Sequence, residues 1–586
     1  MQSRILLTCA YLPMTAEAHA PASIRSLPKA VSHQRSDDVP RHWDHIDREQ
    51  AIVFCIRRLY WHPLSKYPGP FLAKITDLYA AYHAWRGDIH IDLWRQHERY
   101  GPIVRYSPNQ LNFNTAEALK EIYISGAKSF QKSPNYRVLR HGAANTLTMI
   151  NKEEHARRRR IVSQGLSDAA VRFHEPTLMA HIQKCFALLS GTDEPKNVAS
   201  WFNYLSFDIM ADVVFGMQYN LLGSTANRAI PDAIEQLVTT LNYLQGDYAD
   251  HVILSRSNVR VSVLLQSPVT PRIARIDRWL FPKAIQARDQ FLNFVRGLVD
   301  KVMKPDCSPK ATTTIVSILK NAHDPVTGQK LGSKEVLAES TTLCVAGSDT
   351  SSTAMSATFF YLANSPKAYR RVQNEVRSLF SSAEEIRIGP KLSKLVFVRA
   401  CIEEALRMSP PTGASLYREV LQGGATVNGE WFPPGVDLGV PIYAIQHNPE
   451  YYPSPFEFRP ERWLESEGTP KKSIEAARSA FCPFSVGSRS CVGKHMALVE
   501  LTLAVAYAVY TLDFEFDPEK QQATDKRWGI EDEFKLRDHI TASKDGPHLR
   551  FTPRVMPEGM PVFENVTELR PVLQNRSMTV PTMGMS

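Results

Sequence analysis

Apolar residues recur at helical spacing along several long stretches of the chain, which predicts a mainly helical protein. One such stretch covers residues 199–216, and a second is expected to form a single long helix from about Ser333, its expected N-cap, to Asn364. Further helical patterns lie at residues 403–408, which precede a pair of prolines, and at residues 497–512. A chain of 586 residues can bury a large core between such helices.

Alternating apolar residues and turn residues predict a smaller β portion. Residues 101–106 and 110–113 read as a hairpin, with turn-forming residues 107–109 between them. Further short strands are expected at residues 425–427 and 437–440, where glycine and proline separate the apolar positions. The pattern as a whole therefore predicts a mainly α protein with a small β lobe.

Composition and charge narrow the classes of partner. The chain is 43% apolar and 22% charged, as expected of a folded globular protein. Its 69 Lys and Arg residues against 60 Asp and Glu residues give a net charge of +9, which suits nucleic acid, an anionic membrane surface or an acidic protein partner. No aromatic–basic repeat or zinc-finger spacing supports nucleic acid. The 8 cysteines form no CxxC pair, and such scattered thiols are typical of a reducing compartment.

One cysteine lies in a short loop, directly before an apolar helical pattern. The loop runs from Phe484 to Gly493 and contains Gly487, Arg489 and Cys491. A thiol at the start of a helix faces free backbone N–H groups, so we expect its pKa to be lowered. The glycines permit a sharp turn and the close approach of a flat cofactor, and the guanidinium suits a carboxylate. The loop therefore suits a thiolate that binds haem iron; a buried free cysteine in a Gly/Ser turn is the alternative.

The long helix contains a glycine and several small polar residues in its middle, at positions 346–351. Such residues weaken a helix interior. The hydroxyl of Thr350 can donate to the carbonyl of Ala346, which bends the helix and opens a turn. Asp349 beside it can carry protons from solvent. A site for dioxygen is one interpretation of this pattern, and an ordinary helix kink is the other.

A carboxylate and two arginines form a third pattern. Glu404 and Arg407 stand three residues apart, so they lie on one helix face and can pair. Such a pair alone is weak evidence, because surface pairs of this kind contribute little. A further arginine, Arg462, lies some fifty residues later in the chain.

A run of four arginines follows His155 at residues 157–160. The run could be a nucleic-acid or nuclear-localisation patch, or a solvated helix face. Since four successive residues cover all sides of a helix, we expect one arginine to point inward while the others stay in water. The outward arginines could dock an acidic protein partner.

The order of these motifs resembles that of the cytochrome P450 superfamily, the haem-thiolate monooxygenases, over roughly residues 55–555. The loop matches the pattern F-x-x-G-x-R-x-C-x-G, and residues 346–351 are similar to the family's A-G-x-D/E-T-T/S motif, with Ser351 in place of the last threonine. The resemblance implies the cytochrome P450 fold, mainly α with a small β lobe, and a b-type haem between two central helices.

The resemblance also implies residue roles. Cys491 is the expected axial ligand of the haem iron, and Asp349 and Thr350 are the expected proton relay. Glu404, Arg407 and Arg462 are the expected triad. The remaining haem contacts, which cover the sulfur, shape the loop or meet the propionates, are assigned to Phe484, Gly487, Gly493, Arg489, Arg159, Arg418 and His155. His155 departs from the family pattern, which has tryptophan there.

The implied activity is reductive activation of O2 and hydroxylation or a related oxidation of a hydrophobic small molecule. No flavin or nicotinamide signature occurs, so electrons are expected from NADPH through a separate cytochrome P450 reductase, with cytochrome b5 as an optional second donor. Fungal microsomal members of secondary metabolite biosynthesis are the type that the chain resembles. Residues 226–310 carry no motif and correspond to helices over the substrate entrance. A haem-thiolate isomerase or dehydratase without external electrons and a non-catalytic haem sensor are the alternatives.

Four segments are expected along the chain. Residues 1–50 are irregular, 51–70 hold a residual membrane-anchor flank and a proline hinge, 71–555 form the monooxygenase domain, and 556–586 are a tail. The apolar run in the second segment is too short to span a bilayer, but basic and aromatic residues follow it, as at the cytoplasmic flank of an anchor. We expect attachment to the cytosolic face of the endoplasmic reticulum membrane. A soluble cytoplasmic protein is the alternative, and a small-residue pattern in the first segment leaves a secretory signal open.

Overall fold

The computed structural model describes most of the chain, in residues 52–126, 128–139, 143–231, 314–465, 468–517 and 533–554 together with Gly297. Apart from Ile52, these residues belong to one compact unit, Val53–Ser586. The predicted irregular segment 1–50 and tail 556–586 lie outside the described residues, and so does the predicted entrance region beyond residue 231.

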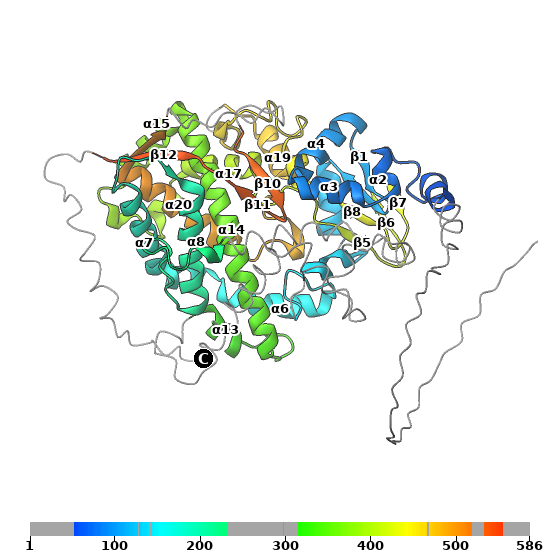
Figure 1. Cartoon of the computed structure of the whole chain (residues 1–586), viewed down its shortest axis with the longest axis horizontal. Coiled ribbons are helices and arrows are strands. Elements are labelled where there is room, and N and C mark those ends of the chain that lie inside the picture. The colour runs from blue at the N-terminus through cyan, green and yellow to red at the C-terminus, as the bar shows by residue number, and fades with distance from the viewer. Residues whose placement is uncertain are drawn as a thin grey trace, which may run out of the picture. The chain divides into compact units, whose positions relative to one another are not determined.

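The four helices predicted from periodicity are confirmed (Figure 1). They are α8 (Val198–Phe215), α14 (Ser333–Asn364), α17 (Val396–Met408) and α20 (Lys494–Thr511). The predicted N-cap of α14 is wrong by one residue. Gly332 occupies the cap position, because the Glu335 carboxylate accepts a 2.8 Å hydrogen bond from the Gly332 N–H and closes the first turn.

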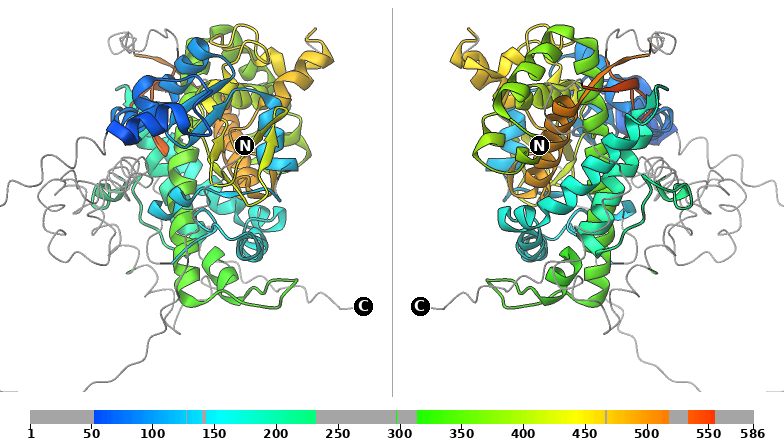
Figure 2. Two further views of the ribbon diagram at one scale, coloured as in Figure 1. Left: turned by 90° about the vertical axis from the view of Figure 1, so that its right-hand side faces the viewer. Right: turned by 90° about the vertical axis from the view of Figure 1, so that its left-hand side faces the viewer.

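The other helices surround these four. The α-helices are α2 (Phe71–Ile75), α3 (Leu78–Arg86), α4 (Ile89–Tyr100), α5 (Ala116–Lys120), α6 (Lys152–Gly165), α7 (Asp168–Leu189), α13 (Ile315–Asn321), α15 (Pro366–Leu379), α16 (Pro390–Ser393), α18 (Ile442–Gln446) and α19 (Lys471–Ala480). The π-helical and 3-10 turns are η1 (Arg57–Trp61), η2 (Glu121–Ser125), η3 (Pro134–Leu139), η6 (Ala383–Glu385), η7 (Pro460–Trp463) and η9 (Gly487–Arg489). The long helix α14 runs through the middle and packs against α8, α17 and α20 (Figure 2).

The β lobe is confirmed as a five-stranded sheet in the order β1-β2-β8-β5-β3. The strands are β1 (Ile103–Ser107), β2 (Gln110–Phe113), β3 (Phe130–Lys132), β5 (Arg418–Val420) and β8 (Asp437–Gly439). β1 and β2 form the predicted hairpin, and β8 is parallel to β2. The predicted strand at 425–427 instead pairs outside this sheet. Three smaller sheets are formed by β6 (Ala425–Val427) with β7 (Glu430–Phe432), by β10 (Leu536–His539) with β11 (Thr541–Lys544), and by β4 (Lys196–Asn197), β12 (His548–Pro553) and β9 (Leu512–Phe516).

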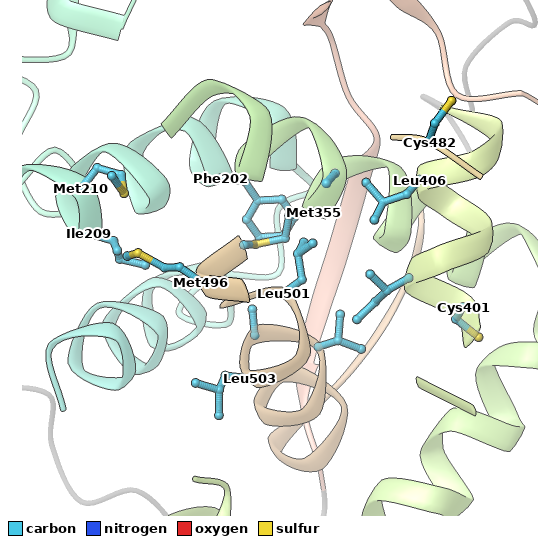
Figure 3. Packing of buried hydrophobic residues seen from close by; sticks show 14 of the residues in the cluster. Phe202, Ile209, Met210, Met355, Cys401, Leu406, Cys482, Met496, Leu501 and Leu503 are labelled. Carbon is cyan, nitrogen blue, oxygen red and sulfur yellow. The ribbon is translucent and has the colours of Figure 1, made fainter. Parts of the chain in front are cut away.

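The main core lies where α8, α14, α17 and α20 meet (Figure 3). α8 and α20 are apolar on most sides, because other helices cover them all round. The buried side chains labelled in Figure 3 include Phe202, Met210, Met355, Leu406 and Leu501. This packing fixes α14 against α20, the helix that follows the cysteine loop.

Candidate active site

The cysteine loop lies between α19 and α20. The Cys491 N–H donates to the Phe484 carbonyl at 2.8 Å, which closes the loop on itself. The backbone N–H groups of Gly493 and Lys494 donate to the Cys491 thiol, as predicted for a cysteine just before a helix. The predicted lowering of the thiol pKa is wrong. Part of the residue is accessible to solvent, yet burial of the thiol raises its pKa and outweighs these N–H groups and the charge of Arg159.

Glycine is required at one end of this loop by close packing. Gly487 has a φ of +77°, and a Cβ added there would lie 1.9 Å from the Tyr123 carbonyl oxygen in η2. Gly493 is less restricted, because an added Cβ would lie 3.9 Å from the Cys491 sulfur. The Phe484 ring packs against the core and lies 5.8 Å from the Lys494 ammonium. That the Phe484 ring covers the Cys491 sulfur stays a prediction.

Cations from three elements gather beside this loop. Arg159 comes from α6, Arg418 from β5 and Arg489 from the loop, and with His155 they line a cavity of about 970 Å³. Ser488 of the cysteine loop also lines this cavity, whereas Cys491 and Thr350 themselves do not. Lys132 on β3 adds a buried ammonium. The sequence analysis missed this residue, because no motif surrounds it.

The charges of this cluster repel one another. Burial lowers the pKa of Lys132 well below its ordinary value, and Arg418 and Arg489 lower it further. Burial and Arg418 lower the pKa of Arg489 to about 10. Burial, followed by Arg489 and Lys132, lowers the pKa of His155 to about 2, so His155 is neutral at physiological pH.

These cations make their hydrogen bonds to backbone carbonyls. Arg489 donates to the carbonyls of Met149 and Ile150 at 2.6 and 2.8 Å, and Arg159 donates to that of Ser490. Among the described residues, no salt bridge joins Lys132, Arg159, Arg418 or Arg489 to a carboxylate. A ligand with two carboxylates would balance this excess of positive charge. The thiol and the cations therefore fit the chemistry of haem b, because a thiolate can bind iron and the cations can neutralise two carboxylates.

The hydrogen bond predicted for the middle of α14 is present, and the helix is unbroken from Ser333 to Asn364. The Thr350 hydroxyl donates to the Ala346 carbonyl at 2.7 Å. A Cβ added at Gly347 would lie 2.6 Å from the Met210 side chain of α8, so glycine also lets the two helices approach. The Asp349 carboxylate lies 3.5 Å from the ammonium of Lys544 on β11. No local motif marks Lys544, because only the hairpin of β10 and β11 brings it to α14.

A second carboxyl group lies close to this turn. Glu500 on α20 is buried, accepts a 2.9 Å hydrogen bond from Ser206, and is also hydrogen-bonded by Ser351. Burial raises its pKa to about 7. The sequence analysis missed this residue, although a glutamate within the apolar run 497–512 was a visible signal. Glu500 ties the helix after the cysteine loop to the residue next to Thr350.

The predicted triad geometry is present and includes a fourth member. Arg407 donates to Glu404 through two nitrogens at 2.9 and 3.0 Å, and Arg462 donates to Glu404 at 2.8 Å. The Trp463 indole N–H donates to the same carboxylate at 2.9 Å and was not predicted. Burial acts to raise the pKa of Glu404, but Arg407 and Arg462 outweigh it and hold the pKa below its ordinary value.

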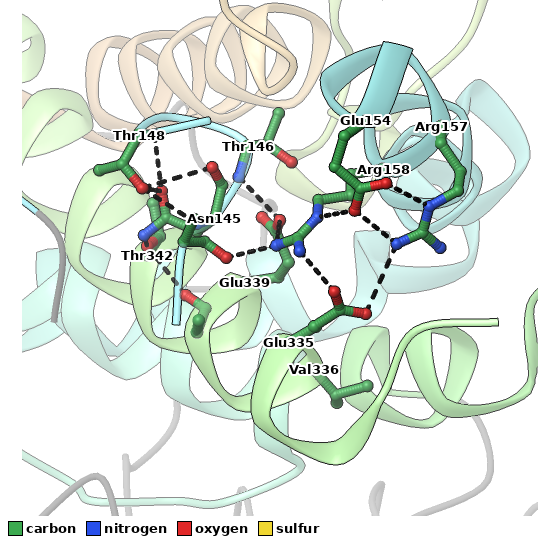
Figure 4. Close-up of polar contacts among 12 residues, drawn as sticks. Asn145, Thr146, Thr148, Glu154, Arg157, Arg158, Glu335, Val336, Glu339 and Thr342 are labelled. Carbon is green, nitrogen blue, oxygen red and sulfur yellow. Dashed lines mark hydrogen bonds and ion pairs between the residues drawn. The ribbon is translucent and has the colours of Figure 1, made fainter. Parts of the chain in front are cut away.

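The expectation for the arginine run is partly wrong. Arg159 points inward as predicted, but Arg157 and Arg158 are also buried (Figure 4). Both donate to Glu154, and Arg158 also pairs with Glu335 on α14. The most exposed of the four, Arg160, pairs with Asp324 at 2.5 Å. Glu154 lies on the same helix, but Glu335 and Asp324 come from segments distant in sequence, which the local pattern does not reveal. Through these pairs the arginines hold α6 in place.

Comparisons with known proteins agree with this site. The family model described as Cytochrome P450 matches residues 66–532. The cytochrome P450 monooxygenase atnE of Emericella nidulans is 43% identical over 86% of this chain and 95% of its own length. The monooxygenases poxM of Penicillium oxalicum and AKT7 of Alternaria alternata are 43% and 40% identical, over 85% and 86% of this chain and 91% and 95% of their lengths.

Among solved structures, the haem domain of cytochrome P450DA superposes with a TM-score of 0.62 at 17% identity, over 80% of this chain and 93% of that one. This likeness confirms the predicted fold. The family uses haem b, O2 and electrons from a reductase, which agrees with the thiol and the cations of the site. The chain belongs to the cytochrome P450 family, and it is a haem-dependent monooxygenase.

Proposed function

We propose that this monooxygenase hydroxylates or otherwise oxidises a hydrophobic small molecule in fungal secondary metabolite biosynthesis. The observation that carries the proposal is the cluster of four unpaired cations beside a cysteine loop whose thiol accepts two backbone N–H groups. The fungal origin of the relatives supports the metabolic setting. Electrons would come from NADPH through cytochrome P450 reductase, and cytochrome b5 is a further candidate donor.

The residues have separate tasks in this proposal. Haem, when bound, supplies the iron that binds and reduces dioxygen. Cys491 would hold the iron through its sulfur, and Arg489, Arg159 and Arg418 would hold the two carboxylates. The neutral His155 can donate a hydrogen bond in the same cluster but adds no charge.

Proton movement is assigned to α14. Asp349 would take a proton from solvent and pass it to the Thr350 hydroxyl, and Thr350 would give its own proton to dioxygen that electrons from the reductase have reduced. The Thr350–Ala346 hydrogen bond holds that hydroxyl at the weakened turn of α14. Glu404, Arg407 and Arg462 keep the segment before the cysteine loop in place and touch no reactant.

The reduced protein with carbon monoxide tests the axial ligand. A cysteinate ligand gives the long-wavelength Soret band, and a folded, haem-loaded protein without this band would contradict the proposal. Shifts of the Soret band on adding terpenoid, polyketide and aromatic acid libraries would then identify the substrate class. Turnover of a hydroperoxide without NADPH would instead favour an isomerase or dehydratase, and a lack of any product with reductase and NADPH would favour a sensor.

Membrane attachment is a second part of the proposal. Most large apolar side chains that are exposed among the described residues lie between Ile52 and Trp85, on η1, α2 and α3 and on the residues just before η1. Trp61 is 74% exposed and Trp85 61%, and basic residues such as Arg57 accompany them. η1 and α3 both pack against α2, so the elements that carry this N-terminal apolar surface are neighbours. Aromatic and basic side chains together suit the headgroup region of an anionic bilayer.

No described helix combines the length and apolarity needed to cross a bilayer. From the exposed aromatic and basic side chains we infer an interfacial attachment of this surface, residues 53–85, to the cytosolic face of the endoplasmic reticulum. The catalytic domain, residues 71–555, would include the part of this surface on α2 and α3. Flotation of the full chain with vesicles of phosphatidylcholine and phosphatidylserine tests this attachment, and a protein that stays at the bottom of the gradient would contradict it.

A further inference from the structure

One buried carboxylate joins two segments that are distant in sequence. Asp538 on β10 is 1% exposed, and its Oδ2 accepts hydrogen bonds from the backbone N–H groups of Gly413 and Ala414 at 3.2 and 2.9 Å. Its Oδ1 accepts a hydrogen bond from the N–H of Ile540 at 3.1 Å. A single side chain therefore holds the tip of the β10–β11 hairpin to the segment that follows α17.

Both segments lie close to the turn of α14 that contains Thr350. Thr353, almost one helical turn further along, donates to the Ala542 carbonyl of β11 at 3.3 Å, and β11 lies beside α14 (Figure 1). The Ala542 N–H in turn donates to the Pro411 carbonyl at 2.8 Å. The segment after Pro411 continues to Arg418, which lines the cavity beside the cysteine loop. The two joined segments are therefore neighbours of both parts of the candidate active site.

The tip of the hairpin has a strained backbone. Ile540 alone connects β10 with β11, because His539 pairs directly with Thr541. The φ of Ile540 is +81°, in the left-handed region that a β-branched residue disfavours. Asp538 stabilises this conformation, since an aspartate that accepts the N–H two residues further on closes a tight turn. Strain of this kind is retained mainly where a functional site needs it.

The backbone of Asp538 is itself held by another element. Its N–H donates to the Gly87 carbonyl, just after α3, at 2.8 Å. Gly413 approaches so closely that an added Cβ would lie 2.7 Å from the His90 Cβ and 3.2 Å from Oδ2 of Asp538. Burial raises the pKa of Asp538 to about 6, so the side chain is ionised at physiological pH and its hydrogen bonds are charge-assisted.

We propose that Asp538 is a positioning residue that limits the size of the molecules accepted beside the Thr350 turn. Its carboxylate keeps the Ile540 tip against residues 413–414, so that the two segments stay together. Without this carboxylate, the tip can relax to a negative φ and separate from the segment, which leaves more room for a bulky ligand. This inference rests on the role proposed above for the Thr350 turn. Asp538 itself touches no reactant.

Binding of azoles to the iron of the full-length holoenzyme tests the proposal without turnover. Imidazole and the bulkier 1-phenylimidazole are titrated separately, and the shift of the Soret band gives the Kd of each. In Asp538→Ala the preference for 1-phenylimidazole over imidazole should rise about tenfold, at the lower end of what the fit of one apolar group contributes. Asp538→Asn, which keeps one oxygen acceptor, should shift the preference in the same direction and replaces the alanine variant if that variant loses haem. An unchanged preference would overturn the proposal.

Asp208→Ala is the matched control. Asp208 on α8 is also buried and accepts the N–H groups of Leu221 and Leu222 at 3.0 and 3.1 Å, but it holds residues 221–222 and not the hairpin. This variant should also lose stability in thermal unfolding, yet keep the wild-type azole preference. An equal rise of the preference in both variants would show that lost stability alone causes it, and would overturn the positioning role.

The same titrations separate this inference from the proposed function. A haem-loaded wild type whose Soret band neither azole shifts would contradict the proposed function and this inference with it. Normal shifts in the wild type, with the same preference in Asp538→Ala, would overturn this inference alone.

Discussion

Arg462 donates a 2.8 Å hydrogen bond to Glu404 from a position 58 residues further along the chain. The side chain of Arg462 is 3% exposed and that of Glu404 is fully buried. A buried charge pair of this kind contributes little net stability against an apolar pair, but the loss of one partner leaves the other charge unpaired. The first prediction follows from this asymmetry.

Replacing Arg462 by alanine should lower the free energy of unfolding by about 3–5 kcal/mol and abolish haem retention. Arg478→Ala is the control, because Arg478 pairs with Glu403, which lies beside Glu404 on α17, but the Arg478 side chain is 43% exposed. Its loss should lower the free energy of unfolding by about 1 kcal/mol or less. Thermal unfolding and the ratio of haem to protein absorbance measure both. Equal losses in the two variants would show that burial of the triad has no special role.

Gly487→Ala should prevent correct closure of the cysteine loop. Gly487 and Gly429 have the same φ of +77°, but an added Cβ meets the Tyr123 carbonyl at Gly487 and nothing within 4 Å at Gly429. Gly429→Ala should therefore cost roughly 1–2 kcal/mol for its backbone conformation alone, and Gly487→Ala clearly more. Denaturant unfolding compares the two, and a similar cost at both positions would contradict the packing argument.

Thr350→Ala should leave haem binding unchanged but divert NADPH from product to peroxide. Thr341 is the matched control, since its hydroxyl makes the same type of bond, to the Leu337 carbonyl at 2.8 Å in the same helix. Thr341→Ala should keep the wild-type ratio of product to NADPH. The assay compares product, peroxide and NADPH consumed with a substrate found by the Soret screen. An unchanged ratio in Thr350→Ala would remove this residue from the relay.

The buried Glu500 should make stability depend on pH. The pKa of Glu500 is about 7 in the folded protein against an ordinary value of 4.5, because burial favours the neutral carboxyl. The contribution of this carboxyl to folding stability is therefore fully present below pH 4.5 and is lost as pH rises through 7. Glu500→Gln should therefore gain stability relative to the wild type between these limits, by up to about 3 kcal/mol. Thermal unfolding of both proteins from pH 4 to 8 tests this, and a constant difference across the range would contradict it.

Binding to anionic vesicles should depend on the exposed tryptophans of the N-terminal apolar surface. Changing Trp61 and Trp85 to serine should weaken binding about tenfold, since aromatic side chains anchor proteins at the headgroup level. Trp431→Ser is the control, because Trp431 is 60% exposed but lies on β7, outside this surface. Vesicle flotation measures all variants, and equal binding by the double variant and the control would contradict the assignment.

Much of this site could be predicted from the sequence because its chemistry is local. The cysteine loop, the turn at Ala346–Thr350 and the pair Glu404–Arg407 each fall within a few residues. Periodicity also identified α8, α14, α17 and α20, because each keeps its apolar pattern over many turns. The position of Arg462 came from its motif and agrees with the structure.

Contacts between distant segments could not be predicted in the same way. Lys132 and Lys544 belong to no motif, and only the packing of β3 and β11 brings them to the site. The arginines of α6 were predicted to be mostly solvent-exposed, because their partners Glu335 and Asp324 lie more than 150 positions away in the sequence. The raised pKa of the Cys491 thiol likewise depends on burial, which the helix-terminus argument left out.

The shared carboxylate of Glu404 has a consequence for how the protein opens. It accepts hydrogen bonds from Arg407, Arg462, Trp463 and the backbone N–H of Arg459. If Glu404 moves away, all four donors lose this partner together. The short segment 459–463, which contains the single 3-10 turn η7, should thus exchange its amide hydrogens as slowly as the central helices, although short connecting segments usually exchange fast. A segment that looks like a connector is, in energetic terms, inseparable from the cooperative unfolding of the whole domain.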